Sequence, residues 1–495
     1  MTNERRPLIP QQEGHFEISH QSSHLPLHRD CARNGTATSE LVALPSDSGL
    51  DECSLELSGA TVFQTSLNIA KLCMGTGTLA LPFAAQKGGL VFNMIGLGII
   101  VVWNYYSADC LLRCLDYLPR TNEEQINNMC NNIECFKMQP EENRKLYGAT
   151  GDFDETRTQN ASCTLSHSPP EGTTKYGIIA WHAFGKPGLV VLDLVMILLF
   201  VGLLTSYEAA MMSFIDSINQ STGRRGYDKI IPSIAVAVLS WADDLSFLSS
   251  FSVVGLLALA LAFGVIFWEG LKDNGWTGLS DIMELNFWPQ SLSAASSWFG
   301  VVVFGYGVVP VIFNIKDSMA KPHFIGLSTK IGLGIAYVGY LFASNGIRTL
   351  FAHTYSFDGD VLQALPDSPI SLVVRLLMTF VVTVTAPFIV VPCGEMIEGK
   401  LFPYNNDVIY KRVLIRTLLC VLCTSLAAFV PGFVHIISFV GCFCVSIAGF
   451  VLPPLFCLQL TRGRHPGFLR DLGLLIIGVL ATTVTSAITF RALLK

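Results

Sequence analysis

The apolar residues of this chain are gathered into runs about twenty residues long, separated by polar stretches. An α-helix of that length crosses the hydrocarbon core of a bilayer, whereas a helix on the surface of a soluble protein would carry a single apolar stripe. The runs therefore predict an all-α, multi-pass membrane protein. About eleven transmembrane helices are expected, at residues 61–85, 89–114, 187–216, 228–242, 246–269, 295–317, 327–350, 369–393, 411–430, 433–459 and 469–492.

Two polar segments fall outside these runs. Residues 1–58 are rich in Ser, His and Gln and poor in aromatic residues, which predicts a disordered, cytosolic tail. Residues 115–175 lie between the second and third predicted helices and show no clear periodicity, so we expect a flexible cytosolic loop. Residues 59–495 would form the transmembrane domain. The first sixty residues lack the apolar core of a signal peptide, so the first helix is expected to act as an uncleaved anchor.

Composition agrees with a membrane protein and argues against a soluble enzyme. Only 14% of the residues are charged, whereas a soluble domain carries about 25%. Many of the fourteen cysteines lie in apolar runs, where they behave as small hydrophobic residues. Cys130 and Cys135 lie in the polar loop, and their spacing suits neither a zinc site nor a redox pair. We therefore expect no metal and no cofactor, and we predict no binding of nucleic acid.

Orientation follows from the basic residues near the helix ends. Ten of them fall on the side of the N-terminus and eight on the opposite side, if eleven helices alternate across the membrane. This bias predicts a cytosolic N-terminus and a C-terminus on the other side. The sequon at Asn219 would then face away from the cytosol and is a candidate for glycosylation, whereas the sequon at Asn160 would stay unmodified.

Two of the predicted helices contain residues that interrupt helical structure. The first contains Gly75, Gly77 and Pro82, and the sixth contains Gly305-Tyr306-Gly307 followed by Pro310. Each opens a set of five helices, which leaves one helix over. Matched interruptions in two halves of a membrane protein are the best indication from sequence of a transporter site.

The physical reason is that lipid cannot satisfy the backbone groups that an interruption frees. Amides at the start of a half-helix suit a carboxylate, and carbonyls at the end of a half-helix suit an ammonium group. A zwitterionic amino acid carries both. The alternative is that the glycines only allow helices to pack closely, as small residues often do in membranes.

The chain also resembles a known family. The run Lys71-x3-Gly75-Thr76-Gly77-x-Leu79-x-Leu81-Pro82 is similar to the first helix of the amino acid/auxin permease family, especially its proton-coupled amino acid transporter branch. Further similarity to that family lies, between about residues 60 and 493, at Tyr176–Gly188, Pro310, Ser318–Pro322, Ala386-Pro387, Pro392, Glu395, Pro431-Gly432 and Ser438-x2-Gly441.

The resemblance implies a five-plus-five inverted repeat like that of the bacterial leucine transporter, with one extra helix. It also implies secondary active transport of amino acids by alternating access around the first and sixth helices. We expect small neutral amino acids as substrates, and coupling to protons rather than sodium. The expected substrate-binding residues are Gly75, Thr76, Gly77, Thr78, Leu79, Tyr207, Phe304, Gly305, Tyr306 and Gly307.

Ionisable residues inside the membrane are rare and are candidates for ion coupling. Lys71 lies one turn before the first interruption, where its ammonium can occupy the place of an ion, or can pair with a carboxylate or cap freed carbonyls. Glu208 in the third helix can carry a proton, because a carboxyl group removed from water favours its neutral form, or can be a static partner of Lys71 or Arg375. Thr383 can offer a hydroxyl to sodium, although such hydroxyls more often bond back to their own helix.

The N-terminal tail contains a short motif that is typical of membrane sorting. Glu4 precedes Leu8-Ile9 by four residues, which resembles an acidic dileucine signal that a sorting adaptor binds. The signal favours endosomal or lysosomal membranes, with the plasma membrane as the alternative. Six-residue matches also arise by chance, and position at the extreme N-terminus is what favours the signal.

Other functions remain open from sequence alone. A sodium-coupled transporter is one alternative, and Lys71 argues against it if its charge fills the ion position. A sensor that binds amino acids with little flux is another, and the long 115–175 loop keeps it open. An enzyme is not expected, because the chain has no metal cluster, nucleophile elbow or HExxH motif.

Overall fold

The structure is a computed structural model. It describes residues 59–118, 169–170, 173–222, 226–242, 251–274, 279–351, 361–365, 368–401, 409–430, 432–462 and 465–493. The predicted tail, the sorting motif, the sequon at Asn160 and most of the predicted 115–175 loop lie outside the described residues. Within the described residues the fold is helical and contains no strand, apart from a single parallel bridge between Ala60 and Met319.

The first half of the chain begins with an interrupted helix. In chain order, its elements are α1 (Val62–Cys73), η1 (Thr76–Ala80), α2 (Leu81–Gly88), α3 (Leu90–Cys114), η2 (Leu115–Tyr117), α6 (Lys175–Thr222), η5 (Gly226–Ile230), α7 (Ile231–Leu239), α9 (Phe251–Asn274) and α10 (Leu279–Glu284).

The second half also begins with an interrupted helix, and it contains three π-helical segments, η8, η10 and η11. Its elements are α11 (Leu292–Gly305), η6 (Val309–Val311), α12 (Ile312–Asp317), η7 (Pro322–Phe324), α13 (Ile325–Leu341), η8 (Phe342–Gly346), α14 (Ile347–Leu350), η9 (Val361–Ala364), α15 (Pro369–Thr385), α16 (Pro387–Leu401), α17 (Ile409–Phe429), α18 (Phe433–Val440), η10 (Gly441–Val445), η11 (Ile447–Val451), α19 (Leu452–Thr461) and α20 (Phe468–Leu493).

The prediction of a multi-pass helical membrane protein is confirmed. Among the described residues, eight helical stretches are long and apolar enough to cross a membrane. The three other predicted ranges also contain helix, namely the interrupted α1–α2, the short α7 and α9. The count of eleven crossings and the inverted repeat stay predictions.

One helix begins earlier than its apolar run. The third helix was expected from residue 187, but α6 begins at Lys175 and bends at Gly185, where φ is 67° and ψ is −152°. Pro187 follows the bend, where a fixed φ suits the start of a helix. The added segment buries Tyr176, Ile179, Ala180 and Ala183, an i, i+3, i+4, i+7 spacing. A single amphipathic stripe of this length does not reach across a membrane, so the apolar-run pattern could not find it.

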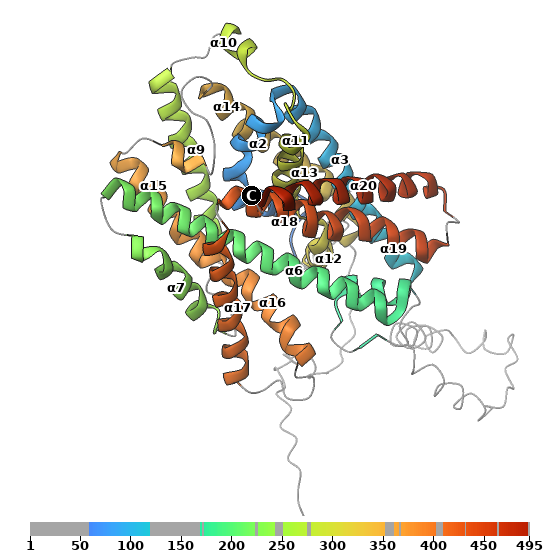
Figure 1. The fold of residues 1–495 in the computed structure, drawn as a ribbon. Helices are drawn as coiled ribbons and strands as arrows, with labels where there is room; N and C mark the ends of the chain where they lie inside the picture. Colours follow the sequence, from blue (N-terminus) through green and yellow to red (C-terminus); the bar gives the residue numbers. More distant parts are fainter. Residues whose placement is uncertain are drawn as a thin grey trace, which may run out of the picture. The chain divides into compact units, whose positions relative to one another are not determined.

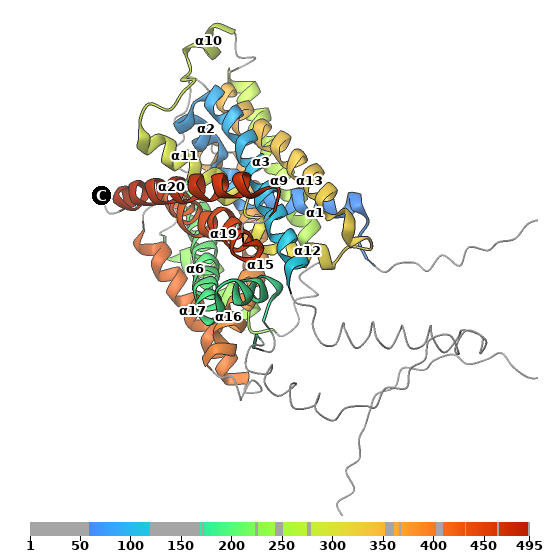
Figure 2. The same cartoon turned by 90° about the vertical axis from the view of Figure 1, so that its right-hand side faces the viewer.

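Both interrupted helices pack against several other helices. α1 packs along α13, while α2 packs against α11. The long green helix α6 packs against α15, α17 and α18 (Figure 1). At the end of the chain α19 and α20, drawn in red, lie side by side and α19 packs against α3 (Figure 2). The helices that contact α11 and α6 therefore surround the region of both interruptions.

Candidate functional site

The first interruption separates α1 from the helical segment that follows it. α1 ends at Cys73, and Met74 leaves helical geometry with φ −77° and ψ 56°. Gly75 is extended, and a 3₁₀ turn then leads into α2, which carries Pro82 near its first position. The carbonyl of Cys73 accepts hydrogen bonds from the Gly75 amide at 2.8 Å and from the Tyr340 hydroxyl at 2.6 Å. The predicted interruption of the first helix is confirmed.

The second interruption lies between α11 and α12. α11 ends at Gly305, and Tyr306 has φ −93° and ψ 27°. The amide of Val308 bonds to the carbonyl of Tyr306 at 2.7 Å, a tight turn that leads into the 3₁₀ segment η6 around Pro310. The proline has no amide hydrogen, so it cannot continue the helical ladder. This predicted interruption is confirmed as well.

The two interruptions touch each other at Gly77. A Cβ atom on Gly77 would lie 2.9 Å from Cδ1 of Phe304 and 3.7 Å from the Cα of Gly305. The backbone conformation there does not require glycine, so space is what excludes a side chain. Gly77 thus lies where the two broken helices approach each other closely, and this place is also the expected binding site.

A cavity of about 530 Å³ lies where the interruptions meet. Its size falls within the range of small-molecule sites, about 300–1,000 Å³. It is bounded by residues of α1, α6, α9, α15 and α16 in addition to both interruptions. Seven of the predicted residues line it, namely Lys71, Gly75, Gly77, Tyr207, Phe304, Gly305 and Gly307.

Three other predicted residues do not line the cavity. The side chains of Thr78, Leu79 and Tyr306 are buried in the protein, and the ring of Tyr306 packs against Tyr340 with centroids 4.7 Å apart. The backbone of Thr76 is described and begins η1, but its side chain lies outside the described part.

Backbone groups at the interruptions are available to a ligand. The amide of Gly77 lies in the first turn after the interruption and finds no backbone acceptor among the described residues. On the other broken helix, the carbonyls of Phe304 and Gly305 find no backbone donor in the same part of the chain. Helix starts favour negative charge and helix ends favour positive charge. The arrangement therefore offers complementary ends to a zwitterion.

The coupling candidates are separated in space. Lys71 lines the cavity, and the described residues give it no ion-pair partner. Glu208 is fully buried and does not line the cavity, although its neighbour Tyr207 does. Its Oε2 accepts a hydrogen bond from Ser233 of α7, and the hydroxyl of Thr424 of α17 also lies beside its carboxyl group.

A static pair between Glu208 and either Lys71 or Arg375 was an alternative, and the described residues do not show such a pair. The described residues place neither cation within ion-pair distance of Glu208. Arg375 is buried and donates to the carbonyls of Leu365 at 2.9 Å and Leu362 at 3.4 Å. Hydrogen bonds from a guanidinium to these carbonyls are charge-assisted and tie α15 to the segment that contains η9.

Two further predicted residues can be placed. The hydroxyl of Thr383 donates to the carbonyl of Thr379 at 2.8 Å, so it bonds back to its own helix as expected. Its neighbour in the same helix, Thr385, lines the cavity instead. Asn219 lies in the last turn of α6 and is buried, so glycosylation would require the end of that helix to open. Its role as an acceptor stays a prediction.

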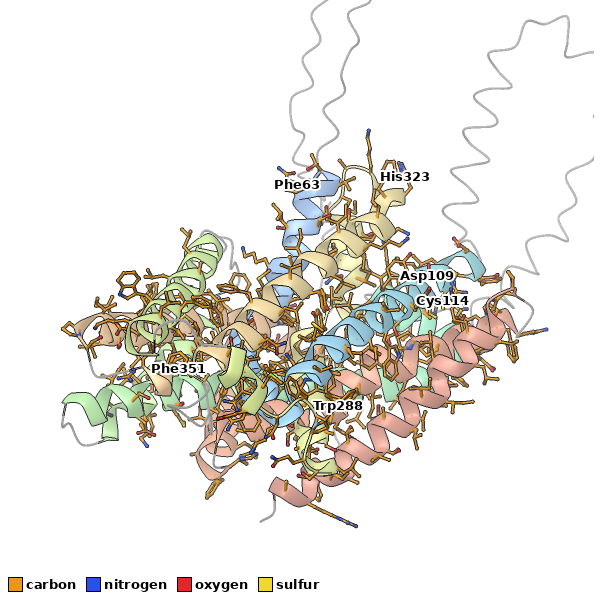
Figure 3. All side chains as sticks on the ribbon, turned by 90° about the horizontal axis from the view of Figure 1, so that it is seen from above. Phe63, Asp109, Cys114, Trp288, His323 and Phe351 are labelled. Atoms are coloured by element: carbon orange, nitrogen blue, oxygen red, sulfur yellow. The ribbon has the colours of Figure 1, made fainter. Side chains whose placement is uncertain are left out.

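An ionic cluster that no sequence pattern indicated joins the end of α3 to the start of α20. Asp471 is fully buried and accepts from Arg113 Nη2 at 2.9 and 3.1 Å and from Arg470 Nε at 3.0 Å. His465 Nε2 lies 3.2 Å from the same carboxylate, and Arg113 Nε also bonds to Asp109 at 3.0 Å. Figure 3 shows Asp109 and Cys114 on α3 toward this end. All these residues flank apolar runs, where charges usually face solvent, so the pattern gave no signal of their burial.

The model of the family described as transmembrane amino acid transporter protein matches residues 58–129 and 161–491. The chain belongs to the transmembrane amino acid transporter family. It is therefore a membrane carrier of amino acids, and the predicted resemblance is confirmed.

Relatives within the transmembrane amino acid transporter family come from plants, fungi and animals. Amino acid transporter ANT1 of Arabidopsis thaliana is 27% identical, over 81% of this chain and 85% of the relative. Vacuolar amino acid transporter 3 of Schizosaccharomyces pombe is 21% identical, over 86% and 57%. Sodium-coupled neutral amino acid symporter 2 of Danio rerio is 22% identical, over 87% and 81%. One of these relatives is named as vacuolar and another as sodium-coupled. Family membership alone therefore decides neither the membrane nor the coupling ion of this chain.

Proposed function

We propose that this protein is a secondary active transporter that moves amino acids by alternating access around its two broken helices. The observation that carries the proposal is the single junction of both interruptions at one cavity of about 530 Å³. A free amide on one helix and free carbonyls on the other suit the two ends of an amino acid. A packing role alone would not require a cavity at this place.

Ion pairs between helix ends support the alternating topology. Lys175 at the start of α6 pairs with Asp317 at the end of α12, and Lys400 at the end of α16 pairs with Asp193 of α6, both at 2.5 Å. Ala60, ahead of α1, bonds to the backbone of Ser318 after α12. Figure 3 shows Phe63 and His323 at the same edge of the bundle. Eleven alternating crossings place all of these ends on the side of the N-terminus.

The cavity lies toward that same side of the interruptions. Away from the place where the two interruptions meet, the cavity is lined by Asn68 of α1, Gly255 near the start of α9, and Phe388 and Ile389 near the start of α16. Each of these lies in the half of its helix nearer to the N-terminal side in the proposed topology. We infer that the structure shows a cytosol-facing conformation, in which the cavity opens toward the side of the N-terminal tail.

The coupling ion in this proposal is the proton, and Glu208 carries it. A fully buried carboxyl group that no described cation pairs with is costly to ionise and stable when protonated. The hydroxyls of Ser233 and Thr424 lie beside it. The titratable side chains of α17 that interact with it are Cys420 and Cys423. Lys71 lines the cavity, and its positive charge would repel a sodium ion there.

The coupling ion can be tested by uptake into proteoliposomes under separate proton and sodium gradients. We expect a pH gradient to drive accumulation of amino acids and sodium to have no effect. Glu208→Gln keeps the shape but cannot release a proton, so accumulation should fall about tenfold or more, while substrate binding persists. Asp216→Asn is the matched control, because its carboxylate on the same helix is half-exposed beside Lys229.

Other outcomes of that experiment separate the alternatives. Uptake that requires sodium and ignores the pH gradient would contradict proton coupling. Binding of amino acids without measurable flux under either gradient would instead support the sensor, for which the 115–175 loop offers a signalling segment.

The proposed location is an endosomal or lysosomal membrane, with the N-terminus in the cytosol. Leu8 and Ile9 lie outside the described residues, and the proposal rests on their motif and on a relative named as vacuolar. We expect Leu8→Ala with Ile9→Ala to move the protein to the plasma membrane, measured by surface labelling and imaging. Leu25→Ala with Leu27→Ala is the matched control in the same tail. An unchanged distribution would remove the sorting motif from the proposal.

A further inference from the structure

The wall of the cavity is strongly apolar. Beyond the broken helices, each neighbouring helix turns aliphatic or thioether side chains toward it, among them Leu199, Leu203, Leu259, Met378, Val382 and Ile389. Polar side chains are few, namely Asn68, Lys71, Tyr207 and Thr385. A ligand that places its zwitterionic end at the interruptions must therefore place its side chain against the apolar wall.

Charge within the cavity is of one sign. Lys71 is the charged side chain among the described residues that line it, and no described carboxylate faces it there. Asn68 lies one turn earlier on the same face of α1. An ammonium or guanidinium group on a substrate side chain would meet a like charge and no counter-ion, in surroundings of low dielectric constant where repulsion is strong.

We propose that the cavity selects amino acids with a bulky apolar side chain, and that Lys71 excludes cationic ones. This inference rests on the proposed function, since it names the substrate class of the same site. It departs from the small neutral amino acids that were expected from sequence. Glycine or alanine would leave most of the apolar wall of a cavity of about 530 Å³ without a partner.

The size of the preference follows from apolar burial. Each buried methylene group improves affinity by about fourfold in a well-fitted site. Leucine carries three more carbons than alanine, so it should bind about tenfold more tightly or better, even if the fit is partial. Norleucine and lysine make a second informative pair, because they have similar length and differ chiefly in the terminal ammonium group.

The test uses the full chain, purified in detergent, and competition binding with glycine, alanine, leucine, phenylalanine, norleucine and lysine. We expect leucine, phenylalanine and norleucine to bind about tenfold or more tighter than alanine, and lysine to bind more weakly than norleucine. Binding needs no ion gradient, so the result does not depend on the coupling mechanism.

Two pairs of variants locate the effect. Leu203→Trp fills part of the cavity and should erase the advantage of leucine over alanine, whereas Leu198→Trp on the exposed face of the same helix should preserve it. Lys71→Met should narrow the gap between norleucine and lysine by about tenfold. Lys330→Met removes an equal charge from an exposed residue outside the cavity and should leave that gap unchanged.

The outcomes are distinguishable. If alanine or glycine binds as well as leucine, or if lysine binds as well as norleucine, the inference is overturned while amino acid transport stands. If none of the six amino acids binds to monodisperse protein, the proposed function fails too. Should Leu203→Trp not fold, the ranking of ligands on the unaltered chain still decides the question.

Discussion

Gly77→Val is expected to weaken amino acid binding by roughly ten- to a hundredfold in protein that still inserts into the membrane. The amide of Gly77 is the free amide in the first turn after the first interruption. A charge-assisted hydrogen bond from such an amide to a carboxylate contributes about 1.5–3 kcal/mol. A branched side chain at this place would displace the ring of Phe304, because the added Cβ would lie 2.9 Å from it.

Because the added side chain would press on Phe304, the folding of Gly77→Val must be checked separately from its binding. Gly300→Val tests packing alone, since its Cβ would lie 2.0 Å from the backbone oxygen of Ser438, which cannot move aside. We expect Gly300→Val to misfold. Gly334→Val adds the same side chain to α13 where nothing lies within 4 Å, and it should bind normally.

Affinity is measured on purified, monodisperse protein, by competition against a labelled amino acid. Near-normal affinity in well-folded Gly77→Val would show that the residue serves packing and that the substrate lies elsewhere. Loss of folding together with normal affinity in the surviving fraction would lead to the same conclusion.

Asp471→Ala is expected to lower the stability of the transporter by about 3 kcal/mol. The carboxylate is fully buried and is the shared partner of Arg113, Arg470 and His465. Removing it leaves the guanidinium of Arg113 without its principal counter-ion. We place the effect at the lower end of the range for a broken buried pair, because 26% of the Arg113 side chain remains exposed.

A matched control separates burial from charge. Asp317→Ala also breaks an ion pair between helices, but both Asp317 and Lys175 are about half-exposed, so the loss should be at most about 1 kcal/mol. Thermal unfolding in detergent, followed by tryptophan fluorescence, compares the two variants. Equal melting temperatures would mean that the Asp471 cluster contributes no more than a surface pair, and that α3 and α20 are held together by apolar packing.

How much of the site the sequence could predict depends on the residue type. Glycine and proline act through their own backbones, so Gly75, Gly77 and Pro310 indicated the two interruptions from sequence. Leu203 and Met378 also line the cavity, but similar apolar residues on the same helices face lipid. Sequence hydrophobicity cannot tell these two faces apart, because lipid tails and a protein interior are both apolar.

The buried charged residues also show what sequence could and could not predict. Glu208 stood out in sequence because it lies within an apolar run, and the structure places it with Ser233 rather than with either expected cation. Asp471 and Arg113 lie at the ends of apolar runs and drew no attention, yet their burial joins helices that are far apart in sequence.

The sequence by itself determined that this is a multi-pass helical membrane protein with interruptions in its first and sixth helices. Both follow from local properties, namely the length of apolar runs and the backbone preferences of glycine and proline. Only the tertiary structure decided that the interruptions meet at one cavity, that Lys71 faces it and that Glu208 does not. Those relations depend on how each helix is rotated about its axis, which packing against neighbouring helices sets and no local pattern encodes.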